Sequence, residues 1–586
     1  MLNTHWNLEV LYKSFDDPQL SEDFTWIGEE TAALTALAGA DFDCTACWLK
    51  EMLRRLSDLL ERFEKASSYV FLTLAVEATH EAAMACQDKI NNLAMELTLL
   101  ENAFSRRLAA VDGLDALVEA DAELKPFAFA VAERVNSARH MLPEALEGPV
   151  LTMQLTGGRA WEALRNVLDG TAMVDYKGER LPLPQVRGLA YDPDPKVRKS
   201  AYEAELAAYP AYENSMAAAL NAIKGEAMAM GKMKGYATVL DEVLDISRMD
   251  RATLDALIGA IEKYLPAFRK YLKAKARVLG HKNGLPFYDL FAPVGSAQKS
   301  YTYDEAHAYL VDILGRFSPK MGEFIDRAFC NRWMDALPAP GKGGGAFCAF
   351  IYALGESRIL SNFTGSFSDV STLAHELGHG YHGECLKNEP ILNVSYPMPL
   401  AETASIFNDT LVTQAALKEA DDEEAFTLLE SELMEATQVI VDIYSRYHFE
   451  TALFAGRADH SLSVSELKEN MLAAQRAAYG DGLDPEYLHP YMWQCKSHYY
   501  SADLHFYNFP YAFGLLFGRG VYALYEKEGE AFVPKYDELL KGAGNHSVAD
   551  AAALMGIDVR DQAFWETSLE SIARDIEHFV QMAEKR

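Results

Sequence analysis

The segment TLAHELGHGYHGE, residues 372–384, brings three histidines and two glutamates together. His375 and His379 are four residues apart, so on a helix both imidazoles project from one face and can bind a single metal ion. Glu376 follows the first histidine directly, and its carboxylate can accept a proton from a water molecule beside that ion. This H-E-x-x-H pattern predicts a metal site with its own general base, on a helix that Ser371 would cap. Two surface histidines on an ordinary helix are the alternative, because so short a pattern also arises by chance.

A third ligand is needed, because a catalytic zinc ion has three protein ligands and one open position. The position six residues past His379, which is histidine in one class of zinc proteases, is Cys385. A carboxylate from further along the chain is the other solution. Glu384 follows too closely on the same helix and Glu389 lies in a turn, whereas Glu402 follows the prolines of YPMPLAE just inside a new helix. Glu402 is the predicted ligand, although the helix dipole also favours a glutamate in the first turn of any helix.

Helices must position these groups, because helical patterns dominate the chain. No proline occurs between Pro18 and Pro126 or between Pro399 and Pro485, and apolar residues recur at three- and four-residue spacing in both spans. One strand-like region, residues 343–366, directly precedes the histidine-rich segment. We therefore expect long amphipathic helices packed on each other and a small β-sheet beside the histidines.

The chain is too long, at 586 residues, for one compact domain. A proline-rich stretch at residues 181–205 separates an N-terminal helical region from the remainder. We expect an N-terminal helical lobe at residues 1–115, a second N-terminal domain with the boundary segment at 116–195, and a catalytic domain at 196–586.

The formal net charge of -32 disfavours nucleic acids and anionic membrane surfaces as partners, because both present phosphates that an acidic protein repels. There is no apolar run of about 18 residues, and the N-terminus lacks the pattern of a signal peptide. The 7 cysteines are scattered, which argues against a disulfide framework, so we expect unpaired thiols even at Cys44 and Cys47. These features predict a cytoplasmic location.

Several motifs together resemble one protein family. The segments GGAFCAF, SRILSNFTGSFSDVSTLAHELGHGYH, YPMPLAETASIFND and HFYNFPYAFG are similar to those of oligoendopeptidase F, in the thimet oligopeptidase family of zinc metallopeptidases. A weaker similarity extends to HWNLEVLY, DPDPKVRKSAYEAE and LPFYDLFAPV. The resemblance therefore covers nearly the whole chain.

This resemblance implies a mainly α, almost all-helical metallopeptidase of the zincin type, with two lobes and a deep central channel. It implies one zinc ion per chain, which would polarise a peptide carbonyl and lower the pKa of a water molecule to about 7. The implied metal ligands are His375, His379 and Glu402, and the implied general base is Glu376. Ser405 and Asp409, one and two turns after Glu402, are expected to hydrogen-bond the ligands.

An oxyanion formed during hydrolysis needs hydrogen-bond donors, and the resemblance assigns this role to a histidine and tyrosines near the C-terminus. The motif match indicates His498, Tyr507 and Tyr511. Both HYY at His498 and HFY at His505 resemble the family pattern, and the spacing favours His498. An aromatic core is the alternative reading of this tyrosine-rich segment.

The segment ESRILSNFTGS is expected to be an edge strand along which an extended peptide lays its backbone, which would tolerate many side chains. The expected substrate-binding residues are Ser361, Asn362, Phe363, Gly365, His382 and His505. The sequence thus predicts a zinc endopeptidase of short unstructured peptides. A helical zinc metallocarboxypeptidase and a non-catalytic zinc protein that binds peptides are the alternatives.

Overall fold

The structure, a computed structural model, describes residues 2–295 and 299–586. Contacts divide the chain into two compact units, each assembled from three separate segments. The first unit comprises Met1–Met141, Gln298–Ala416 and Leu524–Ile557, and the second comprises Leu142–Ala297, Leu417–Ala523 and Asp558–Arg586. Helices form nearly all of the regular structure in both units, which confirms the predicted mainly α fold with two lobes. The predicted boundaries of three domains stay a prediction.

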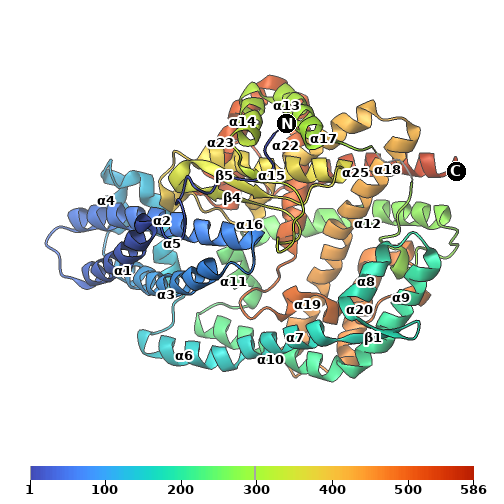
Figure 1. Ribbon diagram of the computed structural model, residues 1–586. Coiled ribbons are helices and arrows are strands. Elements are labelled where there is room, and N and C mark those ends of the chain that lie inside the picture. Colours follow the sequence, from blue (N-terminus) through green and yellow to red (C-terminus); the bar gives the residue numbers. More distant parts are fainter. Residues whose placement is uncertain (1, 296–298) are drawn as a thin grey trace. The chain divides into compact units, whose positions relative to one another are not determined.

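The first unit contains a group of N-terminal helices and a group around the histidine-rich segment (Figure 1). Its helices are α1 (Pro18–Gly39), α2 (Thr45–Val76), α3 (Glu81–Ala109), α4 (Leu114–Ala120), α5 (Ala128–Arg139), α13 (Tyr303–Phe317), α14 (Pro319–Cys330), α15 (Phe367–Leu386), α16 (Met398–Ala401), most of α17 (Thr403–Glu419), α23 (Val533–Gly542) and α24 (Val548–Ala553). The expected long proline-free helices are thus present at the N-terminus.

Helices α1, α2 and α3 lie side by side, in blue in Figure 1. In α2, Leu49, Leu53 and Leu56 follow the helical repeat and are at most 1% exposed, so one apolar face enters the core. Burying each such side chain contributes roughly 1.5–3 kcal/mol. Cys44 and Cys47, at the start of α2, are joined by a disulfide, so the expectation of free thiols is wrong for this pair, whose Cα atoms lie 5.3 Å apart.

A three-stranded sheet packs against α15 in the first unit (Figure 1). Its order is β3 (Met334–Asp335), β5 (Glu356–Leu360), β4 (Phe347–Ile351), with β3 parallel and β4 antiparallel to β5. The sheet lies beside the histidines, as the sequence predicts. β5 is nevertheless the central strand, so the expectation that ESRIL forms an edge is wrong. The two edge strands are β3 and β4, and β4 is the longer one, paired with β5 along its whole length.

The second unit is also helical, with one small hairpin. Its elements are α6 (Glu144–Thr156), α7 (Gly158–Thr171), β1 (Met173–Tyr176), β2 (Glu179–Pro182), α8 (Leu183–Gly188), η2 (Leu189–Tyr191), α9 (Pro195–Ala208), α10 (Glu213–Met233), α11 (Val239–Ile246), α12 (Arg251–Val278), η4 (Phe287–Asp289), α18 (Asp422–Thr437), η7 (Gln438–Asp442), α19 (Ile443–Arg457), α20 (Val464–Tyr479), α21 (Met492–Cys495), η10 (Ser497–Tyr500), most of α22 (Phe509–Glu528) and α25 (Gln562–Ala583).

Helix pairs form the framework of the second unit. Helices α7 and α10 lie side by side in Figure 1, and α12 packs along α25, where the rings of Tyr271 and Phe579 are 5.3 Å apart. Asp194 caps α9 through a hydrogen bond from the Lys196 amide. Between α18 and α19 the chain makes a π-helical turn, η7, a rare geometry that often marks functional positions. Within the described parts of the chain, no helix is long and apolar enough to cross a membrane.

Candidate active site

A tight turn fixes the start of α15, the helix that carries the H-E-x-x-H segment. Ser366 is its N-cap: the Ser366 hydroxyl accepts a hydrogen bond from the Asp369 amide, and the Asp369 carboxylate accepts one from the Ser366 amide, which completes a capping box. The Asp369 carboxylate also accepts hydrogen bonds from the amides of Thr364 and Gly365 at 3.0 and 2.9 Å. The prediction that Ser371 caps this helix is wrong, because the helix begins about one and a half turns earlier, at Ser366. Ser371 lies inside the helix and donates a hydrogen bond to Asp409.

His375, His379 and Glu402 converge in the first unit. The Oε2 atom of Glu402 lies 3.2 Å from Nε2 of His375 and 3.5 Å from Nε2 of His379. Two ligands of one tetrahedral zinc ion, each at about 2.0–2.1 Å, are separated by about 3.3 Å. The donor atoms therefore fit a shared zinc ion, and side-chain exposures of 28%, 19% and 24% leave room for water or substrate.

Gly378 explains how the two parts of this cluster meet. A Cβ atom at this position would lie 2.6 Å from the Cα of Ser405 and closer still to the carbonyl oxygen of Ala404. No residue other than glycine fits here, so the backbone of α15 touches the start of α17. Glu402 itself lies in the break between α16 and α17, and not inside a helix as expected.

Ser405 holds the third ligand in position. Its hydroxyl donates a 2.8 Å hydrogen bond to Oε2 of Glu402, the same oxygen that faces the histidines. This is the interaction expected for a residue that orients a metal ligand. Asp409 accepts a hydrogen bond from Ser371 of α15, the helix that carries both histidines, and its predicted contact with the ligands stays a prediction.

The charges of the site favour a carboxylate ligand and a separate base. Burial opposes ionisation of Glu402, but its hydrogen bonds to His375 and His379 and their charges hold its pKa well below the usual value. Glu376 is 6% exposed, and burial raises its pKa above the usual value, although both histidines act against this shift. A carboxyl whose pKa is raised toward neutrality is a better proton acceptor for water than an ordinary one.

The two rejected ligand candidates are occupied elsewhere. Glu384 pairs with Arg327 at 3.0 Å and with Lys387 at 2.7 Å. Glu389 lies 3.4 Å from the Lys541 ammonium. Both carboxylates are thus neutralised by cations of the protein, and of the three candidate ligands the described structure brings Glu402 alone to the histidines.

An aromatic cluster in the second unit contains the expected oxyanion donors. The ring of His498 lies 5.1 Å from that of Tyr507 and 6.2 Å from that of Tyr511, and the two tyrosine rings are 5.3 Å apart. Burial lowers the pKa of His498, and the cations of Arg446 and Lys496 lower it further. A neutral imidazole of this kind can donate a hydrogen bond without carrying a net charge.

His505 lies in a different environment. Its Nδ1 atom is 3.2 Å from the ammonium of Lys224, which forms a buried 2.7 Å ion pair with Glu450. Burial and the charge of Lys224 place the pKa of His505 well below its usual value. His505 is therefore part of a buried charge network, and His498 is the histidine that the structure groups with the two tyrosines.

Similarity to known proteins identifies the family of this chain. The profile of peptidase family M3 matches residues 188–571. The chain belongs to peptidase family M3. This peptidase is 23% identical over 566 residues to oligopeptidase PepF of Bacillus subtilis, covering 94% of this chain and 83% of that protein. It is 25% identical over 536 residues to an oligoendopeptidase F homolog of Borreliella burgdorferi, covering 89% of each.

Solved structures share the fold of this M3 peptidase. A Chlamydophila abortus crystal structure has a TM-score of 0.83 at 22% identity and covers 98% of both chains. Oligoendopeptidase F from Enterococcus faecium has a TM-score of 0.70 at 16% identity, covering 97% of this chain and 99% of that one. The resemblance to oligoendopeptidase F predicted from the sequence motifs is confirmed.

His382 of this M3 peptidase does not line an open surface. It is completely buried, its Nε2 contacts the carbonyl oxygen of Leu540 at 3.1 Å, and its ring stacks on Tyr396 at 4.0 Å. Burial lowers its pKa to about 3, so the imidazole is neutral. His382 thus packs from α15 against α23, and its role in substrate binding stays a prediction.

Residues 361–365 of the peptidase form the turn between β5 and α15. The amides of Ser361 and Phe363 donate to the carbonyl oxygens of Asp335 and Ala336 at 2.9 and 2.7 Å. The Asn362 side chain donates to carbonyl oxygens of the preceding loop, and Gly365 has a φ of 104°, which favours glycine. These contacts are structural, and a role of these residues in substrate binding stays a prediction.

Sequence reasoning missed several neighbours of the site in this peptidase. Gly378 and Tyr396 carry no motif that identifies their contacts, although a glycine inside a helical metal motif is a signal of close packing. The thiol of Cys348 on β4 is another such neighbour: burial raises its pKa, and the charge of Glu376 raises it further. Arg446 and Lys496 were not expected beside His498.

Proposed function

We propose that this M3 peptidase is a zinc endopeptidase that hydrolyses internal bonds of short, unstructured peptides. The observation that carries the proposal is the convergence of Glu402 Oε2 with the Nε2 atoms of His375 and His379 at zinc-ligand spacing, with Glu376 on the same helix. Membership of family M3 and the oligoendopeptidase F relatives support the same conclusion.

The residues have separate roles in this proposal. Zinc, when bound, polarises the scissile carbonyl and makes water more acidic. Glu376 accepts the proton of the attacking water and can return it to the leaving amine. His498, Tyr507 and Tyr511 donate hydrogen bonds to the oxyanion, which supplies the charge stabilisation that acyl transfer requires.

The edge strand β4 offers a route for binding the peptide backbone. β4 pairs with β5 on one side, and within residues 2–295 and 299–586 no strand pairs with its other side. An extended peptide can add to such an edge through main-chain hydrogen bonds. We propose β4, in place of β5, as the strand that reads the substrate backbone, and a cytoplasmic location stays a prediction.

Mass spectrometry of products from a mixed peptide pool tests this function. We expect internal cleavage of peptides of roughly five to twenty residues, because an extended residue spans about 3.3 Å and the channel implied by the resemblance is finite. Cleavage should stop in a chelator and return with zinc. Stepwise loss of one C-terminal residue would identify a carboxypeptidase, and a lack of products would leave a non-catalytic peptide-binding protein.

A further inference from the structure

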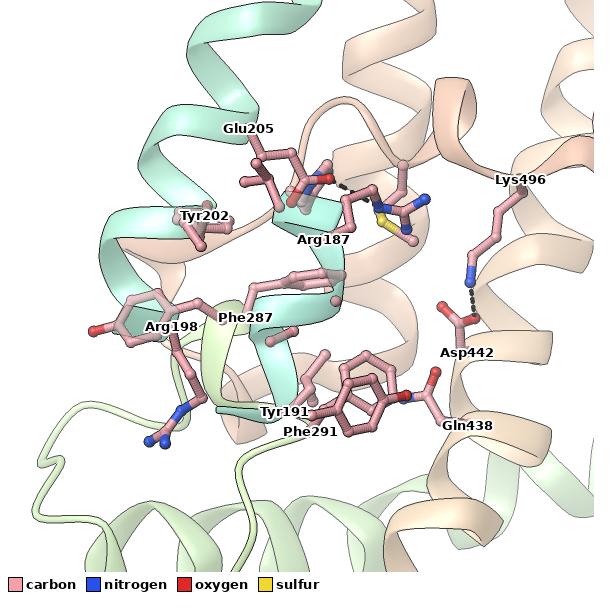
Figure 2. Close-up of a pocket in the computed structure, with 18 of the residues that line it drawn as sticks. Arg187, Tyr191, Arg198, Tyr202, Glu205, Phe287, Phe291, Gln438, Asp442 and Lys496 are labelled. Atoms are coloured by element: carbon pink, nitrogen blue, oxygen red, sulfur yellow. Dashed lines mark hydrogen bonds and ion pairs between the residues drawn. The ribbon is translucent and has the colours of Figure 1, made fainter. Parts of the chain in front are cut away.

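A cavity of about 350 Å³ lies wholly within the second unit, apart from the elements that carry the H-E-x-x-H segment (Figure 2). It is lined by α8, α9, η2 and η4, by η7, and by the segment that ends at Lys496. Its volume is at the lower end of the range of about 300–1,000 Å³ found for small-molecule sites. None of the predicted catalytic residues lines it.

One side of the cavity carries charge. Arg187 lies 3.1 Å from Glu205 through its Nε atom, and Lys496 lies 3.5 Å from Asp442. Asp442 is already bound more closely by Arg446, at 2.6 and 2.7 Å. The residues that line the cavity include three cations, Arg187, Arg198 and Lys496, and two carboxylates, Glu205 and Asp442. The region thus has excess positive charge, although the chain as a whole has a net charge of -32.

The cations have unused hydrogen-bond donors. Among the described residues, Glu205 is the only ion-pair partner of the Arg187 side chain, and Asp442 is the only one of Lys496. In Figure 2 one nitrogen of Arg187 faces Glu205, and the rest of the guanidinium points toward the side of the cavity that carries Lys496. A guanidinium has five N–H donors and an ammonium three, so most of their donors remain available to a ligand.

The opposite side of the cavity is aromatic. The rings of Tyr191 and Phe291 are 5.0 Å apart, and Phe287 packs on His489 at 5.1 Å. Figure 2 shows Phe287, Tyr191 and Phe291 on the side away from Lys496. His489 is 1% exposed, and its Nδ1 atom has no hydrogen-bond partner within the described chain. A ligand that fits this lining has an apolar body and an anionic group.

A metal ion fits the cavity less well, although Glu205, His489 and Cys495 bring possible ligand atoms together. Arg187 already neutralises the Glu205 carboxylate, and Tyr209 donates a 2.5 Å hydrogen bond to the same Oε1 atom. Burial raises the pKa of the Cys495 thiol to about 11, so the thiolate that metals prefer is scarce. The adjacent guanidinium would also repel a cation.

We propose that this cavity binds a carboxylate attached to an apolar or aromatic body, with Arg187 and Lys496 holding the carboxylate and the Tyr191 wall covering the apolar part. The C-terminus of a peptide and a free N-acylated amino acid share this chemistry. The first source rests on the proposed peptidase function, and the second does not. Binding at Lys496 would also fix the start of η10, which carries His498 two residues later.

Isothermal titration calorimetry tests the site with N-acetylphenylalanine and its uncharged amide. We expect the acid to bind and the amide to bind at least tenfold more weakly. Arg187→Met and Lys496→Met should each lower the affinity for the acid by about tenfold to a hundredfold, as expected for the loss of a hydrogen bond to a charged group. Arg180→Met, on the exposed strand β2, is the matched control and should bind like the parent.

Two further measurements serve as controls for this experiment. Carboxylates also bind metal ions, so the titration is repeated on metal-free protein, where the affinity should be unchanged. Tyr191→Ala removes a side chain that is 58% exposed, so the variant should fold like the parent. It should nevertheless bind the acid several-fold more weakly. Equal binding of acid and amide, full affinity in Arg187→Met, or inorganic phosphate binding as tightly as the acid would overturn the proposal.

Kinetics distinguish the two sources of carboxylate. If the occupant is the substrate C-terminus, amidating that terminus should raise KM about tenfold in the parent but not in Arg187→Met, and N-acetylphenylalanine should compete. If the occupant is a separate molecule, amidation should have no effect and the acid should not compete. A chain without peptidase activity would still bind the acid in calorimetry, so failure of the proposed function and failure of this site are separable.

Discussion

Two clusters in this protein combine histidine with a carboxylate, and only one of them is suited to a metal ion. In the first unit Glu402 faces His375 and His379, and in the second unit Glu205 faces His489 and Cys495. Both clusters bring their possible ligand atoms within 4.8 Å of one another. The residue types are therefore insufficient to distinguish them.

The surroundings of the carboxylate make the difference. Glu205 pairs with Arg187 at 3.1 Å, while the described residues include no lysine or arginine paired with Glu402. The histidines beside Glu402 can exchange their protons for a metal ion, whereas a guanidinium keeps its charge at every ordinary pH. A carboxylate neutralised by arginine stabilises the fold, and one neutralised only by imidazoles remains available to a cation.

Loss of metal is the largest effect that this comparison predicts. His379→Ala should reduce zinc to less than a tenth of an ion per chain and peptide cleavage to background, because two ligands hold zinc poorly. His489→Ala, the matched change in the second cluster, should keep the full zinc content. Elemental analysis of the dialysed proteins measures both. Zinc loss in the second variant alone would reverse the assignment of the clusters.

Removal of the base should separate chemistry from metal binding. Glu376→Gln keeps the shape of the side chain but cannot accept a proton, so we expect roughly a 10²–10⁴-fold fall in kcat with unchanged zinc. The measurement is kcat under saturating peptide together with metal content. A variant that retains more than a tenth of the parent activity would show that another group takes the proton.

The aromatic cluster should affect the transition state more than binding. Tyr507→Phe, Tyr511→Phe and His498→Ala should each lower kcat about a hundred- to a thousandfold, or about 2.7–4 kcal/mol, with KM and zinc nearly unchanged. His505→Ala is the control, since His505 contacts the Lys224 network, and it should alter thermal stability more than kcat. If only His505→Ala loses kcat, the catalytic histidine is His505.

The second cluster should affect stability and its pH dependence. Burial opposes ionisation of Glu205, but His489 and Arg187 lower its pKa below the usual value. This stabilisation is complete above the unfolded-state pKa of about 4.5 and is lost as pH falls through the lower folded-state pKa. Glu205→Gln should therefore reduce the free energy of unfolding by about 1–3 kcal/mol at pH 7.

Urea unfolding at several pH values measures this effect. The difference between Glu205→Gln and the parent should shrink below pH 4.5, because the parent carboxyl is then protonated in the unfolded chain and increasingly in the folded one. A constant difference across this range would mean that packing, and not charge, accounts for the loss of stability.

The sequence predicted the parts of the site that depend on local spacing. The four-residue interval between His375 and His379 determines a shared helical face, and the oligoendopeptidase F motifs indicated Glu402. The start of α15 was missed, because Ser371 and Ser366 are both plausible caps and only Ser366 has an Asp three residues later to complete the box.

Features formed by distant segments were beyond the sequence. β5 became a central strand because two residues, Met334 and Asp335, pair with its end from a different part of the chain. The cluster at Glu205 joins residues about 290 positions apart, as its contact with Cys495 shows, and no local pattern links them. The motif spacing already favoured His498 over His505, but the contact of His505 with Lys224 could not be predicted from it.

The backbone contact at Gly378 has a consequence for how the enzyme acquires its metal. Since main-chain packing holds α15 against the start of α17, the positions of the three donor atoms are set by the fold of the backbone. In the zinc peptidase proposed above, the metal-free protein is therefore already folded and can take up its ion in one step, without refolding.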